Sequence, residues 1–317
     1  MKVLVTGSEG FVGSHLLPAL AAEGHETLAT SLDGSTGHRL ELPDGAAAAA
    51  LVADFRPEAV IHLAAISAVP AAARAPELAW RVNVDGVRSI HGALARHAPR
   101  AALLHVSSGT VYGDARPGEA AADESRPCRP GSAYAWSKLA GEAWLAMAGG
   151  AGGAGPRTIV ARPFNHIGPG QSDAFAISSF ARQIAEAELA GGGEIRTGNL
   201  ESRRDFLDVR DVVAAYIALI GSARASGIYN VCAGTTLGIG DLLTELRRRS
   251  RVETRLVADP ARRRDSDHDP VLGSSERLRR ETGWRPRHAL PETIGDLLSD
   301  WRERVARSAA PHRGSGA

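Results

Sequence analysis

The chain has 317 residues, of which 37 are basic and 36 acidic, so its formal net charge is only +1. This balance gives no case for nucleic-acid or membrane-surface binding, and no apolar run reaches the ~18 residues of a membrane span. Cys128 and Cys232 are too few for a disulfide framework, and the start of the chain has no leader pattern. We therefore expect a cytoplasmic protein.

The first half of the chain alternates between short apolar runs and Ala-rich segments with helical spacing. Strands are predicted at 2–6, 26–30, 59–64, 102–107 and 157–163. Helices are predicted at 11–24, 77–97 and 133–148. Such alternation is typical of a parallel sheet with helices on both faces. The sequence predicts an α/β fold, with a Rossmann-type doubly wound dinucleotide-binding domain over residues 1–165.

The second half of the chain is less regular. Helices are predicted near 174–190, 209–221, 239–250 and 291–306, and a strand at 228–231. We expect a smaller C-terminal α/β domain over 166–317 that binds the substrate, with parts of 206–232 returning to the first domain. A Gly-rich loop is predicted at 148–155 and a frayed tail over the last ten residues.

Three glycines follow the first predicted strand. The stretch TGSEGFVG places Gly7, Gly10 and Gly13 between that strand and the first helix, a spacing related to the dinucleotide fingerprint. Such glycines permit a tight turn, a close approach to pyrophosphate, and packing of the helix on the strand. The helix N-terminus then faces the phosphates. We expect NAD(H) or NADP(H) as cofactor.

The second strand leaves the choice between these two cofactors open. Asp33 lies roughly where an acid about 20 residues past the fingerprint would bind the ribose 2′-hydroxyl of NAD. A cap within the loop explains Asp33 equally well. Ser31 at the strand end and Arg39 nearby also leave room for a 2′-phosphate.

A tyrosine and a lysine are spaced four apart in the stretch YAWSK. On a helix, Tyr134 and Lys138 share a face, and an ammonium beside a phenol lowers the phenol pKa. The tyrosine can then act as a general acid or base. The chain has only one other lysine, Lys2, among many arginines, which favours a chemical reason for Lys138.

Together, TGxxGxxG, VSSGTVYG and YxxxK resemble the extended short-chain dehydrogenase/reductase family of NAD-dependent epimerases and dehydratases. The resemblance implies that Ser108, Tyr134 and Lys138 are catalytic, with Ser108 on the C4 oxygen of a sugar. Downstream, 161–171, 179–188, 198–216, 227–234 and 259–264 resemble the members that act on GDP-sugars. A GDP-sugar substrate is implied, as is a homodimer formed through 77–97 and 133–148.

The resemblance also implies the binding residues. The implied cofactor contacts are Gly7, Gly10, Phe11, Val12, Gly13, Ser31, Leu63, Ala64, Ala65, Tyr134, Lys138 and Pro163. The implied substrate contacts are Ser108, Asn165, Arg182, Asn199, Arg204 and Arg264. Asn83 resembles a helix asparagine that bridges to the lysine.

Other polar residues are given structural roles. His62 and His166 are expected to pack or to bond the backbone, and Arg247 to Arg251 to be a solvated surface. Asp205, Asp208 and Asp211 are expected as caps of a strand-to-helix turn, and no metal site is predicted.

Positions 109 and 110 separate two kinds of chemistry. In the relatives that remove water from a sugar, the strand end supplies a glutamate, often beside an aspartate, where this chain has Thr110 and Gly109. A threonine hydroxyl is too weak a base to take a proton from C5, and glycine has no side chain. These two positions therefore favour hydride transfer at C4 over removal of water. Together with the resemblance to the GDP-sugar members, they imply NAD(P)H-dependent reduction of the C4 ketone of GDP-4-dehydro-6-deoxy-D-mannose to GDP-D-rhamnose. A nucleotide-sugar 4-epimerase, a GDP-mannose 4,6-dehydratase-like enzyme and a nucleotide-sensing binding protein stay as alternatives.

Overall fold

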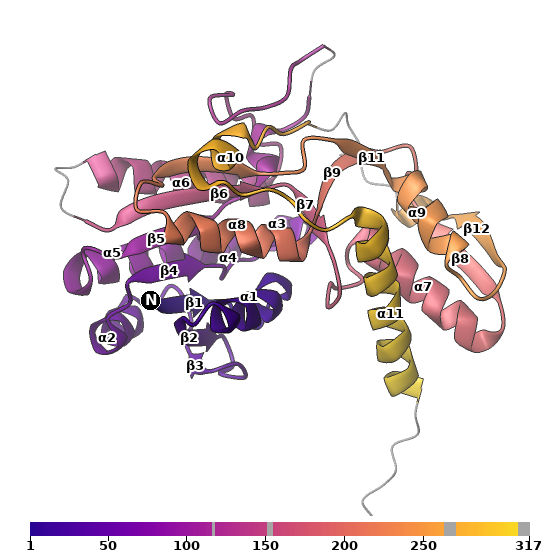
Figure 1. The fold of residues 1–317 in the computed structure, drawn as a ribbon, viewed down its shortest axis with the longest axis horizontal. Coiled ribbons are helices and arrows are strands. Elements are labelled where there is room, and N and C mark those ends of the chain that lie inside the picture. Colours follow the sequence, from indigo (N-terminus) through magenta and orange to yellow (C-terminus); the bar gives the residue numbers. More distant parts are fainter. Residues whose placement is uncertain (116–117, 151–154, 263–270, 310–317) are drawn as a thin grey trace, which may run out of the picture.

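A seven-stranded sheet dominates the computed structural model, which describes residues 1–115, 118–150, 155–262 and 271–309 (Figure 1). Its strand order is β10-β6-β5-β4-β1-β2-β3, and every pairing is parallel. The strands are β1 (Lys2–Thr6), β2 (Glu26–Ser31), β3 (His38–Arg39), β4 (Ala59–His62), β5 (Ala102–Val106), β6 (Arg157–Pro163) and β10 (Gly227–Val231). Because all strands run the same way, their carboxyl ends form one edge.

Helices cover both faces of this sheet, as the alternating sequence predicts. Val3 and Val5 of β1 lie in one core with α1 and α8, while Leu4 lies in the opposite core with α2, α5 and α6. The period of two in a strand produces this division. The helices are α1 (Phe11–Ala22), α2 (Gly45–Phe55), α5 (Gly86–His97), α6 (Ala133–Gly150), α8 (Val209–Gly221) and α10 (Glu276–Thr282). The Rossmann-type prediction is confirmed.

A second body lies beside the sheet (Figure 1). Its core joins three helices through residues such as Phe180, Leu243 and Trp301. The helices are α7 (Ala176–Ala190), α9 (Ile239–Arg248) and α11 (Leu290–Ala309). Two further sheets belong here: β12 (Thr254–Ala258) with β8 (Gly193–Thr197), and β11 (Thr236–Gly238) with β9 (Arg203–Asp208) and β7 (Asn165–Ile167).

Several predicted boundaries differ from the structure. The helix predicted at 77–97 is three elements: α4 (Pro76–Trp80), a π-helical turn η1 (Arg81–Asp85) and α5. α6 extends to Gly150 and α11 to Ala309, so the predicted loop and tail begin later than expected. The rest of those segments falls on 151–154 and 310–317, outside the described residues. Short elements complete the chain: α3 (Val69–Arg74), η2 (Gly109–Tyr112) and η3 (Pro260–Arg262).

The predicted domain division at residue 165 stays a prediction. β10 belongs to the large sheet and α8 packs against α1, although both follow that boundary in the chain. The fold thus brings late segments back to the first body.

Candidate active site

The loop between β1 and α1 is shaped by its glycines. Gly7 has a φ of +69°, and a Cβ there would lie 2.6 Å from Ala64 Cα. At Gly13, a Cβ would lie 2.3 Å from the carbonyl oxygen of Ser8. Gly10 is the N-cap of α1, and among the described residues no side chain caps this helix. The first N–H groups of α1 are therefore available to an anion, and the loop fits the pyrophosphate of a dinucleotide.

The predicted cofactor residues come together along the carboxyl edge of the large sheet. They lie after β1 (Gly7 and Gly10), in the first turn of α1 (Phe11 to Gly13), at the end of β2 (Ser31), after β4 (Leu63 to Ala65) and at the end of β6 (Pro163). The strand order reverses beside β1, where doubly wound sheets bind their ligands. Each individual contact stays a prediction.

The three predicted catalytic residues meet at this same edge. Ser108 follows β5, while Tyr134 and Lys138 lie one turn apart at the start of α6. Their exposed fractions are 8%, 9% and 3%. Tyr134 lies near enough to Ser108 for that hydroxyl to influence its pKa, and the Lys138 ammonium donates to the carbonyl oxygen of Val106 at 2.8 Å. The side chains are therefore held in place by the protein itself.

The electrostatics of this group differ from the sequence prediction. Burial raises the pKa of the Tyr134 phenol, and the hydrogen bond with Ser108 opposes this shift. Burial also lowers the pKa of Lys138 to about 8, against the influence of Glu142. The prediction of a lowered phenol pKa is wrong for this structure, because burial disfavours the charged form. Tyr134 is thus a protonated group at neutral pH, as a proton donor must be.

Thr110 orients the hydroxyl of Ser108. Its amide donates to Ser108 Oγ at 3.2 Å and its hydroxyl donates at 2.9 Å. With two donors directed at Oγ, the hydrogen of Ser108 is available for another acceptor. At Gly109, a Cβ would lie 2.8 Å from the Phe164 ring. This strand end therefore offers hydroxyl groups and has no room for a side chain at 109.

A buried ion pair beneath Lys138 was missed by the sequence reasoning. Glu142 lies one turn beyond Lys138 and is 5% exposed. Its carboxylate accepts hydrogen bonds from the Ser107 hydroxyl and from Arg162 Nε, the latter at 3.0 Å. It thereby joins α6 to the ends of β5 and β6. The signal was present, because Tyr134, Lys138 and Glu142 are spaced four apart on one helix face.

Asn83 supports the site from η1. Its side-chain oxygen accepts from the Ile66 amide at 2.8 Å, and its amide group donates to Ser137 Oγ at 2.8 Å. Asn83 therefore contacts the neighbour of Lys138, whereas the resemblance implied a bridge to Lys138 itself. The residue joins the loop after β4 to α6.

The two histidines have the structural roles expected of them. His62 Nδ1 is hydrogen-bonded to Thr6 Oγ1 at 2.7 Å, and burial lowers the pKa of His62 to about 3. His166 Nδ1 is bonded to the carbonyl oxygen of Phe164 at 3.0 Å. His62 is consequently neutral across the physiological range.

Two of the predicted substrate residues lie on neighbouring strands. Asn165 begins β7 and donates to the carbonyl oxygen of Asp205 at 3.3 Å. Arg204 lies on β9 and donates to the carbonyl oxygen of Arg203 at 2.7 Å. β7 and β9 pair in parallel, so both residues belong to the three-stranded sheet of the second body. Arg264 lies outside the described residues.

Arg182 lines a surface pocket of the second body. Its guanidinium is paired with Asp173 and, at 2.7 Å, with Glu186. The same pocket includes Ser179, which accepts a hydrogen bond from Arg262 at 3.0 Å. Asn199, in the loop after β8, accepts from the Glu201 amide at 3.0 Å. These groups have protein partners that a ligand would have to replace.

The aspartates of the 198–216 stretch are structural. Asp208 caps α8 by accepting from the Arg210 amide at 2.7 Å, as predicted. Asp205 and Asp211 are not part of this cap: their carboxylates hold distant backbone amides. The amides are those of Ala233 and Gly234 for Asp205, and of Arg287 and His288 for Asp211. Within the described ranges no cluster of metal-ligand side chains is found.

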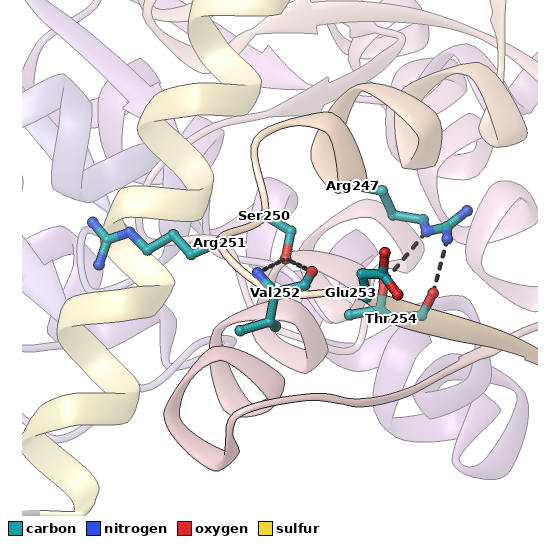
Figure 2. Close-up of a pocket in the computed structure, with 6 residues that line it drawn as sticks. All are labelled: Arg247, Ser250, Arg251, Val252, Glu253 and Thr254. Carbon is teal, nitrogen blue, oxygen red and sulfur yellow. Dashed lines mark hydrogen bonds between the residues drawn. The ribbon is translucent and has the colours of Figure 1, made fainter.

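Another pocket lies where α9 turns into β12 (Figure 2). Arg247 donates there to the carbonyl oxygen of Thr254 at 2.8 Å and to its hydroxyl at 3.2 Å. Ser250 donates to the carbonyl oxygen of Val252 at 2.9 Å. None of the predicted site residues lines this pocket, and its polar groups fasten the turn. We assign it no part in the chemistry.

Known proteins share both the sequence and the fold. The profile of the NAD dependent epimerase/dehydratase family matches residues 3–232. The GDP-6-deoxy-D-mannose reductase of Pseudomonas aeruginosa is 39% identical over 96% of this chain and 98% of its own length. The UDP-glucose 4-epimerase of Mycolicibacterium smegmatis is 31% identical over 96% of this chain and 99% of its own.

Solved structures agree with this relationship. RMD from Pseudomonas aeruginosa complexed with NADPH superposes with a TM-score of 0.84 at 36% identity, covering 96% of this chain and 99% of that one. The Thermus thermophilus UDP-glucose 4-epimerase complex with NAD has a TM-score of 0.83 at 28% identity, covering 95% and 99%. The glycine loop, the Tyr134–Lys138 pair and these matches lead to one conclusion: the chain belongs to the NAD dependent epimerase/dehydratase family.

Proposed function

We propose that this protein is an NAD(P)-dependent oxidoreductase that reduces the C4 ketone of GDP-4-dehydro-6-deoxy-D-mannose to GDP-D-rhamnose. The nicotinamide cofactor supplies the hydride. Ser108 donates a hydrogen bond to the carbonyl oxygen and stabilises the charge that develops there. Tyr134 delivers the proton to that oxygen, and Lys138 stabilises the phenolate that results. Each role uses a group that the protein already holds at the carboxyl edge of the sheet.

The observation that carries the proposal is the pair of residues after Ser108. Removal of water from a sugar needs a base at C5, and a carboxylate serves that purpose. Position 109 has no space for a side chain beside Phe164. The Thr110 hydroxyl donates its hydrogen bond to Ser108. Hydride transfer at C4 needs neither a base nor an acid at these positions. The relationship to a GDP-6-deoxy-D-mannose reductase over nearly the whole chain supports the same reaction.

A direct assay tests this function. The protein is supplied with enzymatically prepared GDP-4-dehydro-6-deoxy-D-mannose and with NADH or NADPH, and the loss of reduced cofactor is followed by absorbance. We expect stoichiometric oxidation and a product identified by NMR as GDP-D-rhamnose. No cofactor consumption with this substrate, combined with activity on a UDP-sugar, would refute the proposal.

A nucleotide-sugar 4-epimerase is the second candidate, because epimerases are among the relatives at 31% identity. It would use the same Ser108, Tyr134 and Lys138. An epimerase regenerates its cofactor in each cycle, whereas a reductase must release the oxidised form. Cofactor that copurifies through gel filtration, with turnover in the absence of added NAD(P)H, would favour the epimerase.

We also propose a homodimer formed through α4, α5 and α6. Leu78 and Trp80 on α4 are 49% and 48% exposed, and Trp136 and Met147 on α6 are 56% and 65% exposed. Because α4 and α6 contact each other, a second copy has apolar side chains from both helices to cover. Light scattering after gel filtration should give twice the chain mass, and the double variant Trp80→Glu/Trp136→Glu should give a monomer.

The proposed location is the cytoplasm. Both cysteines are free thiols, as in reducing compartments. In the ranges that the structure describes, no helix has the length and apolar character of a membrane span. Fractionation of cells that express the untagged chain tests the location.

A further inference from the structure

NAD(H) and NADP(H) differ at a single place, the 2′ position of the adenosine ribose. In dinucleotide-binding folds this ribose lies over the carboxyl end of the second strand. An acid there binds the 2′-hydroxyl, whereas an arginine accommodates the 2′-phosphate, which carries close to two negative charges. The groups at the end of β2 therefore decide which cofactor binds more tightly.

One carboxylate reaches this place from the glycine loop. Glu9 lies between Ser8 and the N-cap Gly10, and its side chain is exposed. Its Oε1 accepts a hydrogen bond from the Leu32 amide at 3.4 Å. Leu32 is the first residue after β2, so Glu9 carries its charge across to the ribose end of the site.

A second carboxylate lies on the other side of Leu32. Asp33 Oδ1 accepts from the Ser31 hydroxyl at 3.2 Å and from the Ser35 amide at 2.9 Å. The hydrogen bonds from Ser35 lower the pKa of Asp33, so its carboxylate is charged at neutral pH. The loop is fastened to the glycine loop by a 2.6 Å hydrogen bond between Ser8 and Thr36. Both carboxylates are thus held at one strand end.

Arg39, the arginine at this edge of the sheet, is paired with a carboxylate of the protein. Arg39 on β3 is the register partner of Ser31, and its guanidinium lies 3.4 Å from the Glu41 carboxylate. Glu41 offsets the charge of Arg39. The Arg39 side chain is 70% exposed, so it is not positioned as a buried phosphate clamp would be.

We propose that Glu9 and Asp33 make this site selective for NAD(H) over NADP(H). Each carboxylate repels a 2′-phosphate and accepts a hydrogen bond from a 2′-hydroxyl. One neighbour in structure was solved with NADPH, so the proposed selectivity concerns residues of this chain itself. It depends on the cofactor that the family uses and is independent of which sugar is reduced.

Dissociation constants for NADH and NADPH, measured by calorimetry without any sugar, test the proposal. We expect the purified protein to bind NADH at least about tenfold more tightly than NADPH, the combined effect of two unit charges near a phosphate. Glu9→Gln and Asp33→Asn keep the hydrogen-bond acceptors and remove the charges. Each should lower the ratio of the two constants by about threefold to tenfold, through tighter NADPH binding.

Glu26→Gln is the matched control. It removes one negative charge from the opposite end of β2, where Glu26 is paired with Lys2 at 3.4 Å, and it should leave the ratio unchanged. Equal or tighter binding of NADPH by the unmodified protein would overturn the proposal. So would an unchanged ratio in both carboxylate variants, or a selective loss of NADPH binding in Arg39→Gln. Because no sugar is present, these results are separate from the test of the reductase reaction.

Discussion

The two sides of the proposed site, one catalytic and one that binds the substrate, satisfy their polar groups in different ways. At the carboxyl edge of the large sheet, Ser108, Tyr134 and Lys138 are almost fully buried, and Ser108 and Lys138 are hydrogen-bonded to nearby protein groups. In the second body, Arg182 and Arg204 are more exposed, and their guanidinium groups bond to surface carboxylates or to the backbone. One side is preorganised for chemistry, and the other has partners that it can exchange.

This difference assigns different kinetic roles to the two sides. Preorganised groups stabilise the transition state and should act on kcat. Groups that bind the nucleotide equally in the ground and transition states should act on KM. Substitutions on each side test that division.

Replacing Tyr134 by Phe should abolish most of the activity. Loss of a general acid lowers kcat by about 10²- to 10⁴-fold, while NADH binding should change little. Steady-state kinetics and a cofactor titration measure the two effects. Tyr216→Phe is the matched control, because its buried hydroxyl has no hydrogen-bond partner among the described residues. Unchanged turnover in Tyr134→Phe would rule out the mechanism.

Replacing Glu142 by Gln should destabilise the fold. Arg162, with a side chain only 3% exposed, would keep its charge without a charged partner, which typically costs about 3–5 kcal/mol of unfolding free energy. Urea denaturation measures the loss. The double variant Glu142→Leu/Arg162→Met removes both charges and should recover much of the stability. A loss below about 1 kcal/mol in the single variant would contradict this prediction, because it would mean that the Glu142–Arg162 pair contributes no more than an exposed salt bridge does.

Replacing Arg204 by Ala should act mainly on substrate binding. A hydrogen bond from arginine to a charged group is worth about 1.5–3 kcal/mol, so KM for the GDP-sugar should rise about 10- to 100-fold. The value of kcat should change much less. Arg248→Ala is the control, because that side chain is 71% exposed and pairs with Glu245 at the far end of α9. A fall in kcat at constant KM would break the proposed division between the two sides.

Local patterns in the sequence predicted the first body well. The strands 2–6 and 157–163 have the predicted bounds, because each is a short apolar run that ends at a glycine turn or a proline. Tyr134 and Lys138 lie one turn apart on α6, as predicted, because helical spacing alone places them on one face. The glycine loop could also be predicted from local sequence, because Gly7, Gly10 and Gly13 lie within seven residues of one another.

Features set by distant contacts were not predicted. The π-helical turn η1 adds one residue per turn within 77–97, and apolar spacing does not reveal it. The partners Glu142 and Arg162 are 20 residues apart and meet only because β6 lies beside β5. The lowered pKa of Lys138 and the raised pKa of Tyr134 follow from burial, which depends on the whole fold.

The pH dependence of kcat should report the charge on Lys138. Its pKa is about 8 because burial disfavours the ammonium, so the group loses its proton as the pH rises through that value. We expect kcat to fall above pH 8, by at most about tenfold per pH unit. Rate profiles from pH 6 to 10 check this. In Lys138→Arg, which keeps its charge throughout this range, the residual activity should lack the decline.

The smallest expected effect is that of Thr110→Val. Valine keeps the shape of threonine and removes the hydroxyl that donates to Ser108 Oγ at 2.9 Å, while the backbone amide still donates at 3.2 Å. One neutral hydrogen bond is worth about 0.5–1.5 kcal/mol, so kcat should fall about twofold to tenfold with KM unchanged. A change in KM alone would mean that Thr110 contacts the sugar directly. A fall in kcat alone would mean that Ser108 depends on Thr110 for its orientation, and that the preorganised side of the proposed site includes Thr110.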